Sequence, residues 1–173
     1  MPRLLWLLTI ALACRGGSSG PEDQAGQLTA EWTQGNRAVR FSAPAEARWC
    51  ARDSSLEILA VQGDTGVGMA LYAPDTLRAG IYPVRPAASY TPARPQATAA
   101  LRLVQPAQLL GFESTGGTVT LSETGGGPLS ASFVMELRSQ VGSDSLTLRG
   151  TFNGLSVLPA AASCGRAHKP GGR

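Results

Sequence analysis

The sequence predicts an all-β domain, either an antiparallel β-sandwich or a barrel, with about eight to ten short strands, one disulfide and little or no helix. Three observations support this fold class. Short apolar or alternating segments are separated by turn residues such as Gly, Asn, Asp and Ser. Several segments alternate between apolar and polar residues, which gives a strand one buried and one wet face. No stretch keeps a helical periodicity over three turns.

The first half of the domain predicts six strands. In chain order they cover residues 28–33, 37–42, 47–51, 56–61, 67–72 and 80–84. Gly35-Asn36 and Asp64-Thr65-Gly66 are typical turn sequences and separate strands within this half. The segment 89–96 holds two prolines and predicts a loop.

The second half shows the strand pattern more clearly. Its predicted strands cover residues 98–104, 109–114, 118–123, 129–138 and 145–157, with glycine-rich turns at 116–117, 125–128 and 142–144. Residues 106–110 form the one candidate for a short turn of helix. Because the last three strands follow one another with period-two patterns, we expect them to form an antiparallel meander.

The amino terminus predicts export. Arg3 and the terminal amine precede an apolar run over residues 4–13, which is too short to span a bilayer about 30 Å thick as a helix. The run fits the apolar part of a secretory signal and ends in small residues before Cys14. Ala11-x-Ala13 also satisfies an ordinary signal-peptidase site, which would produce a soluble secreted protein.

Ala13 and Cys14 make this segment resemble a bacterial lipoprotein signal. The resemblance covers about the first fourteen residues, and Ala11 replaces the Leu most common three residues before the cysteine in that family. It implies that the Cys14 thiol carries a diacylglyceryl group and that the protein is anchored to a membrane by its lipid. Arg15 after the cysteine implies the outer membrane, with the domain facing the periplasm or the cell surface.

The domain organisation follows from these ends. We expect a signal peptide over residues 1–13, a flexible Gly/Ser-rich tether over 14–27, a single β domain over 28–164 and a disordered tail over 165–173. The domain of about 135 residues is long enough for one hydrophobic core. Charged residues are only 16% of the chain, and the arginines behind the net charge of +3 form no stripe, so nucleic-acid binding has no support.

Cysteine parity predicts a disulfide. The chain has three cysteines, and lipidation of Cys14 leaves Cys50 and Cys164 to pair in an oxidising compartment. Neither belongs to a C-x-x-C motif, and the chain has a single histidine, which favours a structural bridge over a redox or metal site. Trp49 beside Cys50 is expected to pack in the core or at its rim.

The sequence lacks the residues that most catalytic mechanisms require. The one histidine, His168, lies in the expected tail, so a Ser–His–Asp site is not supported. We expect no metal, because zinc has too few ligands and the carboxylates are scattered, and no cofactor. Asp64-Thr65-Gly66 matches the D-T-G triplet of aspartic proteases, a dimer of which would pair two Asp64 carboxylates. The competing interpretation is a hairpin turn.

The expected function is a non-catalytic binding or scaffolding module on a membrane, with a possible envelope protein as partner; the oligomeric state stays open. The alternative is a hydrolase, most specifically the dimeric D-T-G protease. A proline-rich loop offers weak candidate contact residues, because loops often carry binding groups. These residues are Tyr82, Arg85, Tyr90 and Arg94.

Overall fold

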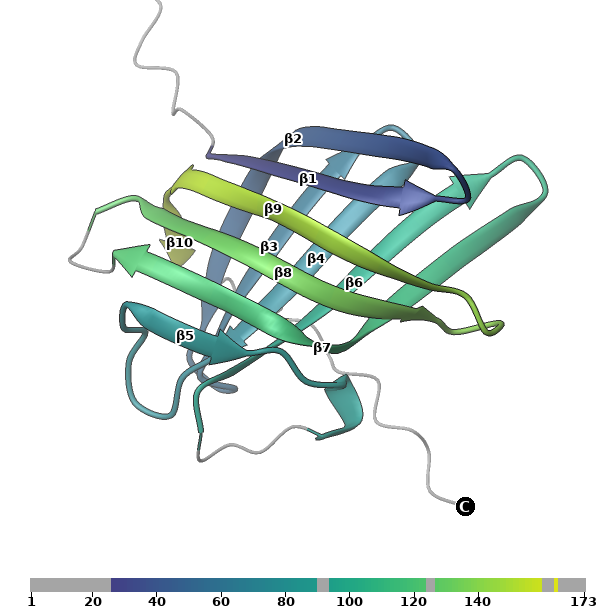
Figure 1. The fold of residues 1–173 in the computed structure, drawn as a ribbon. Coiled ribbons are helices and arrows are strands. Elements are labelled where there is room, and N and C mark those ends of the chain that lie inside the picture. The colour runs from purple at the N-terminus through teal and green to yellow at the C-terminus, as the bar shows by residue number, and fades with distance from the viewer. Residues whose placement is uncertain (1–25, 90–93, 124–126, 160–163, 165–173) are drawn as a thin grey trace, which may run out of the picture.

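A computed structural model of the chain describes residues 26–89, 94–123, 127–159 and 164. The eight long strands form an antiparallel barrel (Figure 1) and follow one another around it in sequence order. They are β1 (Gln27–Gln34), β2 (Arg37–Cys50), β3 (Ser55–Gln62), β4 (Thr65–Tyr72), β6 (Gln96–Gln105), β7 (Gln108–Glu123), β8 (Leu129–Ser139) and β9 (Ser145–Leu155). The pairing of β1 with both β2 and β9 closes the barrel.

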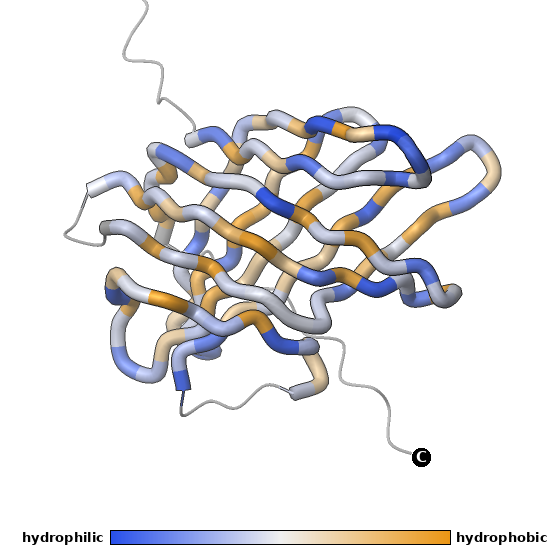
Figure 2. The backbone as a smooth tube through the Cα atoms, in the orientation of Figure 1, coloured by the Kyte–Doolittle hydropathy of each residue, from blue (hydrophilic) through white to orange (hydrophobic). Residues whose placement is uncertain are grey.

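The all-β prediction is therefore confirmed, and a barrel is the form that the domain takes. Figure 2 shows apolar and polar residues alternating along most strands. In β8, for example, Phe133, Met135 and Leu137 are buried while Val134 and Glu136 are exposed. The inward side chains fill the barrel, with phenylalanines on several strands offset by alanines on β2 and β6. This mixture of large and small residues is how small barrels pack their interior.

Two short strands lie outside the eight-strand path. The strand β5 (Gly80–Pro83) pairs with the second half of β7, from Thr118 to Leu121. The strand β10 (Val157–Pro159) runs parallel to β2 at Ala47–Trp49 and takes the place beside β2 that β1 leaves empty. A 3₁₀ turn at Ala87–Ser89 follows β5.

Several predicted element boundaries are corrected. Residues 37–42 and 47–50 belong to one strand, β2, which ends one residue before the predicted boundary, and residues 109–114 and 118–123 belong to β7. Gly116-Gly117 is not a turn: it lies within β7 directly after a β-bulge at Thr115, and Gly117 has a φ of 116°. The candidate turn of helix at 106–110 is wrong: Gln105 pairs with Gln108 in a hairpin, so β7 begins there. The predicted strand 145–157 divides into β9 and β10.

A buried serine bridges the point where β6 and β7 separate. The Ser114 hydroxyl accepts a hydrogen bond from the Ala99 backbone N–H at 3.0 Å and donates one to the Arg85 carbonyl at 2.8 Å. It thereby satisfies a backbone donor of β6 and an acceptor of the segment after β5, which lack a strand partner at this point. Beyond the bulge the edge of β7 is covered by β5 instead of β6.

Candidate functional site

The clearest candidate site is a hollow at one mouth of the barrel, with a volume of about 590 Å³. It lies where β2 ends, β3 and β8 begin, and β9 passes into β10. Its lining combines six apolar residues with Gly127 and three polar residues: Trp49, Leu56, Asp75, Thr76, Leu77, Gly127, Pro128, Leu129, Ser156 and Val157. A hollow of this size and composition is typical of sites for small molecules.

The mouth is built on strands that the barrel holds in place. Leu56 and Leu129 are buried and form its inner part. Trp49 faces Leu56 across the β2–β3 ladder and is half-buried against the core, so its indole supplies a large apolar contact surface beside open space. Asp75 and Thr76, in the loop after β4, are exposed and bring a carboxylate and a hydroxyl to the rim.

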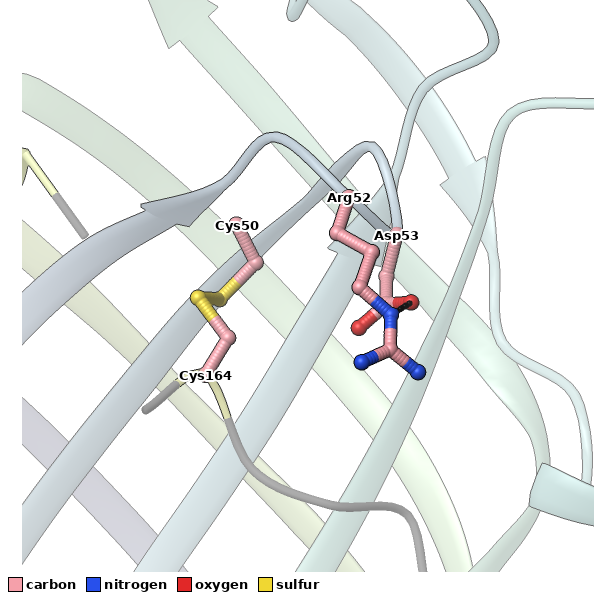
Figure 3. The surroundings of a disulfide bond; sticks show 4 residues. All are labelled: Cys50, Arg52, Asp53 and Cys164. Atoms are coloured by element: carbon pink, nitrogen blue, oxygen red, sulfur yellow. Dashed lines mark ion pairs between the residues drawn. A yellow bond between two sulfur atoms is a disulfide. The ribbon is translucent and has the colours of Figure 1, made fainter. Parts of the chain in front are cut away.

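The disulfide holds the wall of this mouth. Cys50, the last residue of β2, is bonded to Cys164, with the two Cα atoms 5.7 Å apart (Figure 3), so the predicted pairing is confirmed. Between β9 and Cys164 the chain forms β10, which lies against β2 and brings Val157 to the hollow. In the turn after Cys50, the side chains of Arg52 and Asp53 are 3.8 Å apart and lie beside the disulfide.

The mouth offers mainly contact surface and hydrogen bonds. Among the described lining residues Asp75 is the one ionisable group, so these residues supply no carboxylate pair. Within the described ranges, no group of three or more His, Cys, Asp or Glu residues is arranged to hold a metal ion. The lining can bury an apolar ligand and offer hydrogen bonds at its edge.

Comparison with family models, with curated proteins and with solved structures finds no counterpart. The fold and its hollows therefore supply the argument for function.

The loop residues expected to form a contact surface are not together at the mouth. Tyr82 is buried, and its hydroxyl donates to the Arg78 carbonyl at 2.8 Å while accepting from the Arg78 N–H at 3.1 Å. It thus stabilises the turn before β5 and presents no ring to a partner. Arg85 and Arg94 are exposed, and Tyr90 lies outside the described residues.

Asp64 lies at the tip of the β3–β4 hairpin. Gln62 pairs with Thr65, so Gly63 and Asp64 form a two-residue loop, and Gly63 has the positive φ of 54° that such a loop needs. Asp64 is exposed, and its backbone carbonyl accepts a hydrogen bond from the Val104 N–H at 2.8 Å. The turn interpretation accounts for the D-T-G triplet without catalysis.

Cys14, the rest of the expected signal and the expected tether up to residue 25 lie outside the described residues, while Gln27, which was placed in the tether, is the first residue of β1. Among the residues that are described, no helix has the length and apolar character needed to cross a membrane.

Sequence reasoning placed Trp49 in the core or at its rim, and the structure puts it at the rim of the mouth. It missed Asp75, Thr76 and Leu77. These residues lie in the loop between β4 and β5, which carries no periodic pattern, and only the closed barrel brings them opposite β2 and β8.

Proposed function

We propose that this protein is a lipid-anchored binding module of the bacterial envelope, and that the barrel mouth around Trp49 is its binding site. The hollow beside the half-buried Trp49 carries the proposal, because a fixed aromatic group next to open space is a ready contact for an apolar ligand. The ligand class is a small, largely apolar molecule with a polar group that hydrogen-bonds to Asp75 or Thr76 at the rim.

Binding at the mouth is tested with the neutral apolar fluorophore N-phenyl-1-naphthylamine. We expect saturable enhancement of its fluorescence, and we expect Trp49→Ala to weaken binding by about tenfold or more, because a buried aromatic contact is lost. Trp32→Phe is the matched control, since Trp32 is buried and is not part of the mouth. Equal binding by wild type and Trp49→Ala would exclude the mouth as the site.

The anchor has its own test, independent of the ligand. The resemblance of residues 1–14 to a lipoprotein signal and the pairing of the other two cysteines support lipid on Cys14. We expect the intact mass of the mature, membrane-extracted protein to correspond to a chain that begins at Cys14 and carries acyl chains. Cys14→Ser should abolish that mass and release the protein from membranes. A mature species beginning at unmodified Cys14 would contradict the anchor.

A further inference from the structure

A second hollow, of about 1090 Å³, lies near the opposite end of the barrel, between the β1–β2 and β8–β9 hairpins. We call this hollow the notch. It exists because β1 and β9 stop pairing before either strand ends. Their last register pair is Glu31↔Arg149, while β1 continues to Gln34 and β9 begins at Ser145. Figure 1 shows the two strands diverging here.

The backbone of β9 offers free hydrogen-bonding groups to the notch. In an antiparallel ladder, hydrogen-bonded and non-hydrogen-bonded pairs alternate. The Ser139 N–H donates to the Asp144 carbonyl at 2.8 Å, which makes that pair hydrogen-bonded. In the same register the first pair after it, Arg138↔Ser145, and the third, Glu136↔Thr147, are therefore non-hydrogen-bonded. The N–H and C=O groups of Ser145 and Thr147 consequently point away from β8 and toward the notch.

The backbone of β1 does the same from the other side. Gln34 and Arg37 flank a two-residue hairpin loop and form its closing hydrogen-bonded pair. The next pair, Thr33↔Ala38, is therefore non-hydrogen-bonded, because the two kinds of pair alternate. The N–H and C=O of Thr33 consequently point away from β2. In the part of the chain that the structure describes, no strand pairs with β9 before Arg149, or with β1 after Glu31, on the notch side.

One buried side chain also has an unmet hydrogen bond here. Trp32 lines the notch and is only 4% exposed, and its Nε1 is the single buried side-chain nitrogen or oxygen of the described residues without a hydrogen-bond partner. A buried indole N–H usually has an acceptor. An acceptor on a molecule seated in the notch would meet this requirement.

The charges of the notch favour a neutral backbone over an ion. Two carboxylates, Glu31 and Glu136, and two guanidinium groups, Arg138 and Arg149, line it. Within the described residues, none of these four groups forms an ion pair within 4.0 Å. Because the signs balance, no net field selects an anion or a cation.

We infer that the notch is a site for an extended peptide, which adds a strand between β1 and β9. The peptide would exchange backbone hydrogen bonds with Ser145 and Thr147, and one of its carbonyl oxygens would accept from Trp32 Nε1. This is the β-augmentation mode of peptide recognition. The unpaired stretch Ser145–Leu148 spans about 13 Å at roughly 3.3 Å per residue, which suits a segment of four or five residues.

The side chains define the class of peptide. Trp32, Leu137 and Leu146 present apolar groups on the inner side of the notch, while the four charged groups belong to its outer side. A strand has successive side chains on opposite faces, so the matching peptide alternates apolar with polar residues. Acetyl-Val-Thr-Val-Thr-Val-amide has this pattern and is the probe for the test.

The test is a titration of the isotope-labelled protein with this peptide, followed by nuclear magnetic resonance. We expect saturable shifts, at peptide concentrations up to about 1 mM, of the Thr33, Ser145 and Thr147 amides and of the Trp32 indole N–H. The indole of Trp49 at the mouth should not shift, so the result is independent of the proposed function. The absence of shifts at the notch groups, or shifts confined to Trp49, would overturn the inference.

A matched pair of variants separates the backbone contribution from the side chain. Thr147→Pro removes the N–H that points into the notch and leaves the β8–β9 hydrogen bonds in place, so we expect it to weaken binding about tenfold. Thr147→Val keeps the N–H and should bind as the wild type does. Trp32→Phe removes the indole donor and should weaken binding several-fold. Unchanged binding by a folded Thr147→Pro would contradict strand addition, and if that variant does not fold, Trp32→Phe decides.

Discussion

Removal of the disulfide is expected to lower the free energy of unfolding by up to about 4–5 kcal/mol, because the bond closes a loop across a sequence separation of 114 residues. A loss of this size is comparable with the whole net stability of an ordinary domain. It should lower the melting temperature by roughly 10–20 °C. The bond also secures β10 against β2, so the backbone protection of both segments should fall with it.

The measurement is urea unfolding of the double variant Cys50→Ala, Cys164→Ala beside the wild type with and without a reducing agent. Cys50 is fully buried, so its replacement also removes packing around the sulfur. Reduction of the wild type leaves both sulfurs in place and serves as the control for that packing loss. If the double variant and the reduced wild type both unfold within about 0.5 kcal/mol of the oxidised protein, the bridge has no stabilising role.

Gly150→Ala is expected to destabilise the barrel by about 3 kcal/mol or more, at or beyond the upper end for an overpacked core site. Gly150 lies in β9 between Ala30 of β1 and Phe133 of β8. A Cβ at this position would collide with the Thr29 carbonyl oxygen, the Cα of Ala30 and the ring of Phe133. Two of these obstacles are backbone atoms, so relief requires opening the β1–β9 ladder that closes the barrel.

The matched control is Gly68→Ala in β4. This glycine is also in a strand, and a Cβ there would meet no atom within 4 Å and would need no unusual φ. We expect Gly68→Ala to be neutral or to stabilise by up to about 1 kcal/mol, through the reduced freedom of the unfolded chain. Urea unfolding of the two variants should separate them clearly. Similar stabilities would show that β1 and β9 are not as closely packed at Gly150 as the structure indicates.

The fold class could be predicted because strand patterning is local. The alternation of apolar and polar residues in β8 and β9 can be read within each segment. The meander of β7, β8 and β9 could be predicted because these strands follow one another in the chain. The choice between sandwich and barrel could not be made in this way. Closure depends on the pairing of β1 with β9, as at Thr29 and Thr151, which are 122 residues apart in the chain.

Strand boundaries were mispredicted where one residue type has two structural uses. The sequence predicted two strands, 37–42 and 47–51, where the structure has the single strand β2 with Pro44 inside it. Pro44 pairs with Gln27 of β1 at a non-hydrogen-bonded position and lies one residue before the β2–β3 ladder begins at Ala45, so no ladder bond is lost. Gly116-Gly117 similarly predicted a turn. There the chain passes so close to Val134 that a Cβ on Gly117 would strike the Val134 carbonyl oxygen, and β7 continues past the glycines after a bulge at Thr115.

The candidate sites were hardly accessible from the sequence. The mouth joins residues of the β4–β5 loop to strands β2 and β8, and the notch depends on the residue at which β1 and β9 separate. Neither of these spatial arrangements leaves a periodic or compositional signal in the sequence. Trp32 looks like any inward-facing strand residue, and only the packed barrel shows that its indole nitrogen lacks an acceptor.

The position of β1 between β2 and β9 determines how the barrel resists mechanical force. A pull transmitted through the chain before Gly26 acts along β1, which has eight register pairs with β2 and five with β9. Such a load shears two ladders at once, and the hydrogen bonds share it instead of breaking one after another. A pull through Cys164 bypasses β10 and reaches β2 through the covalent bond to Cys50. Tension from either end therefore reaches two adjacent strands, β1 and β2.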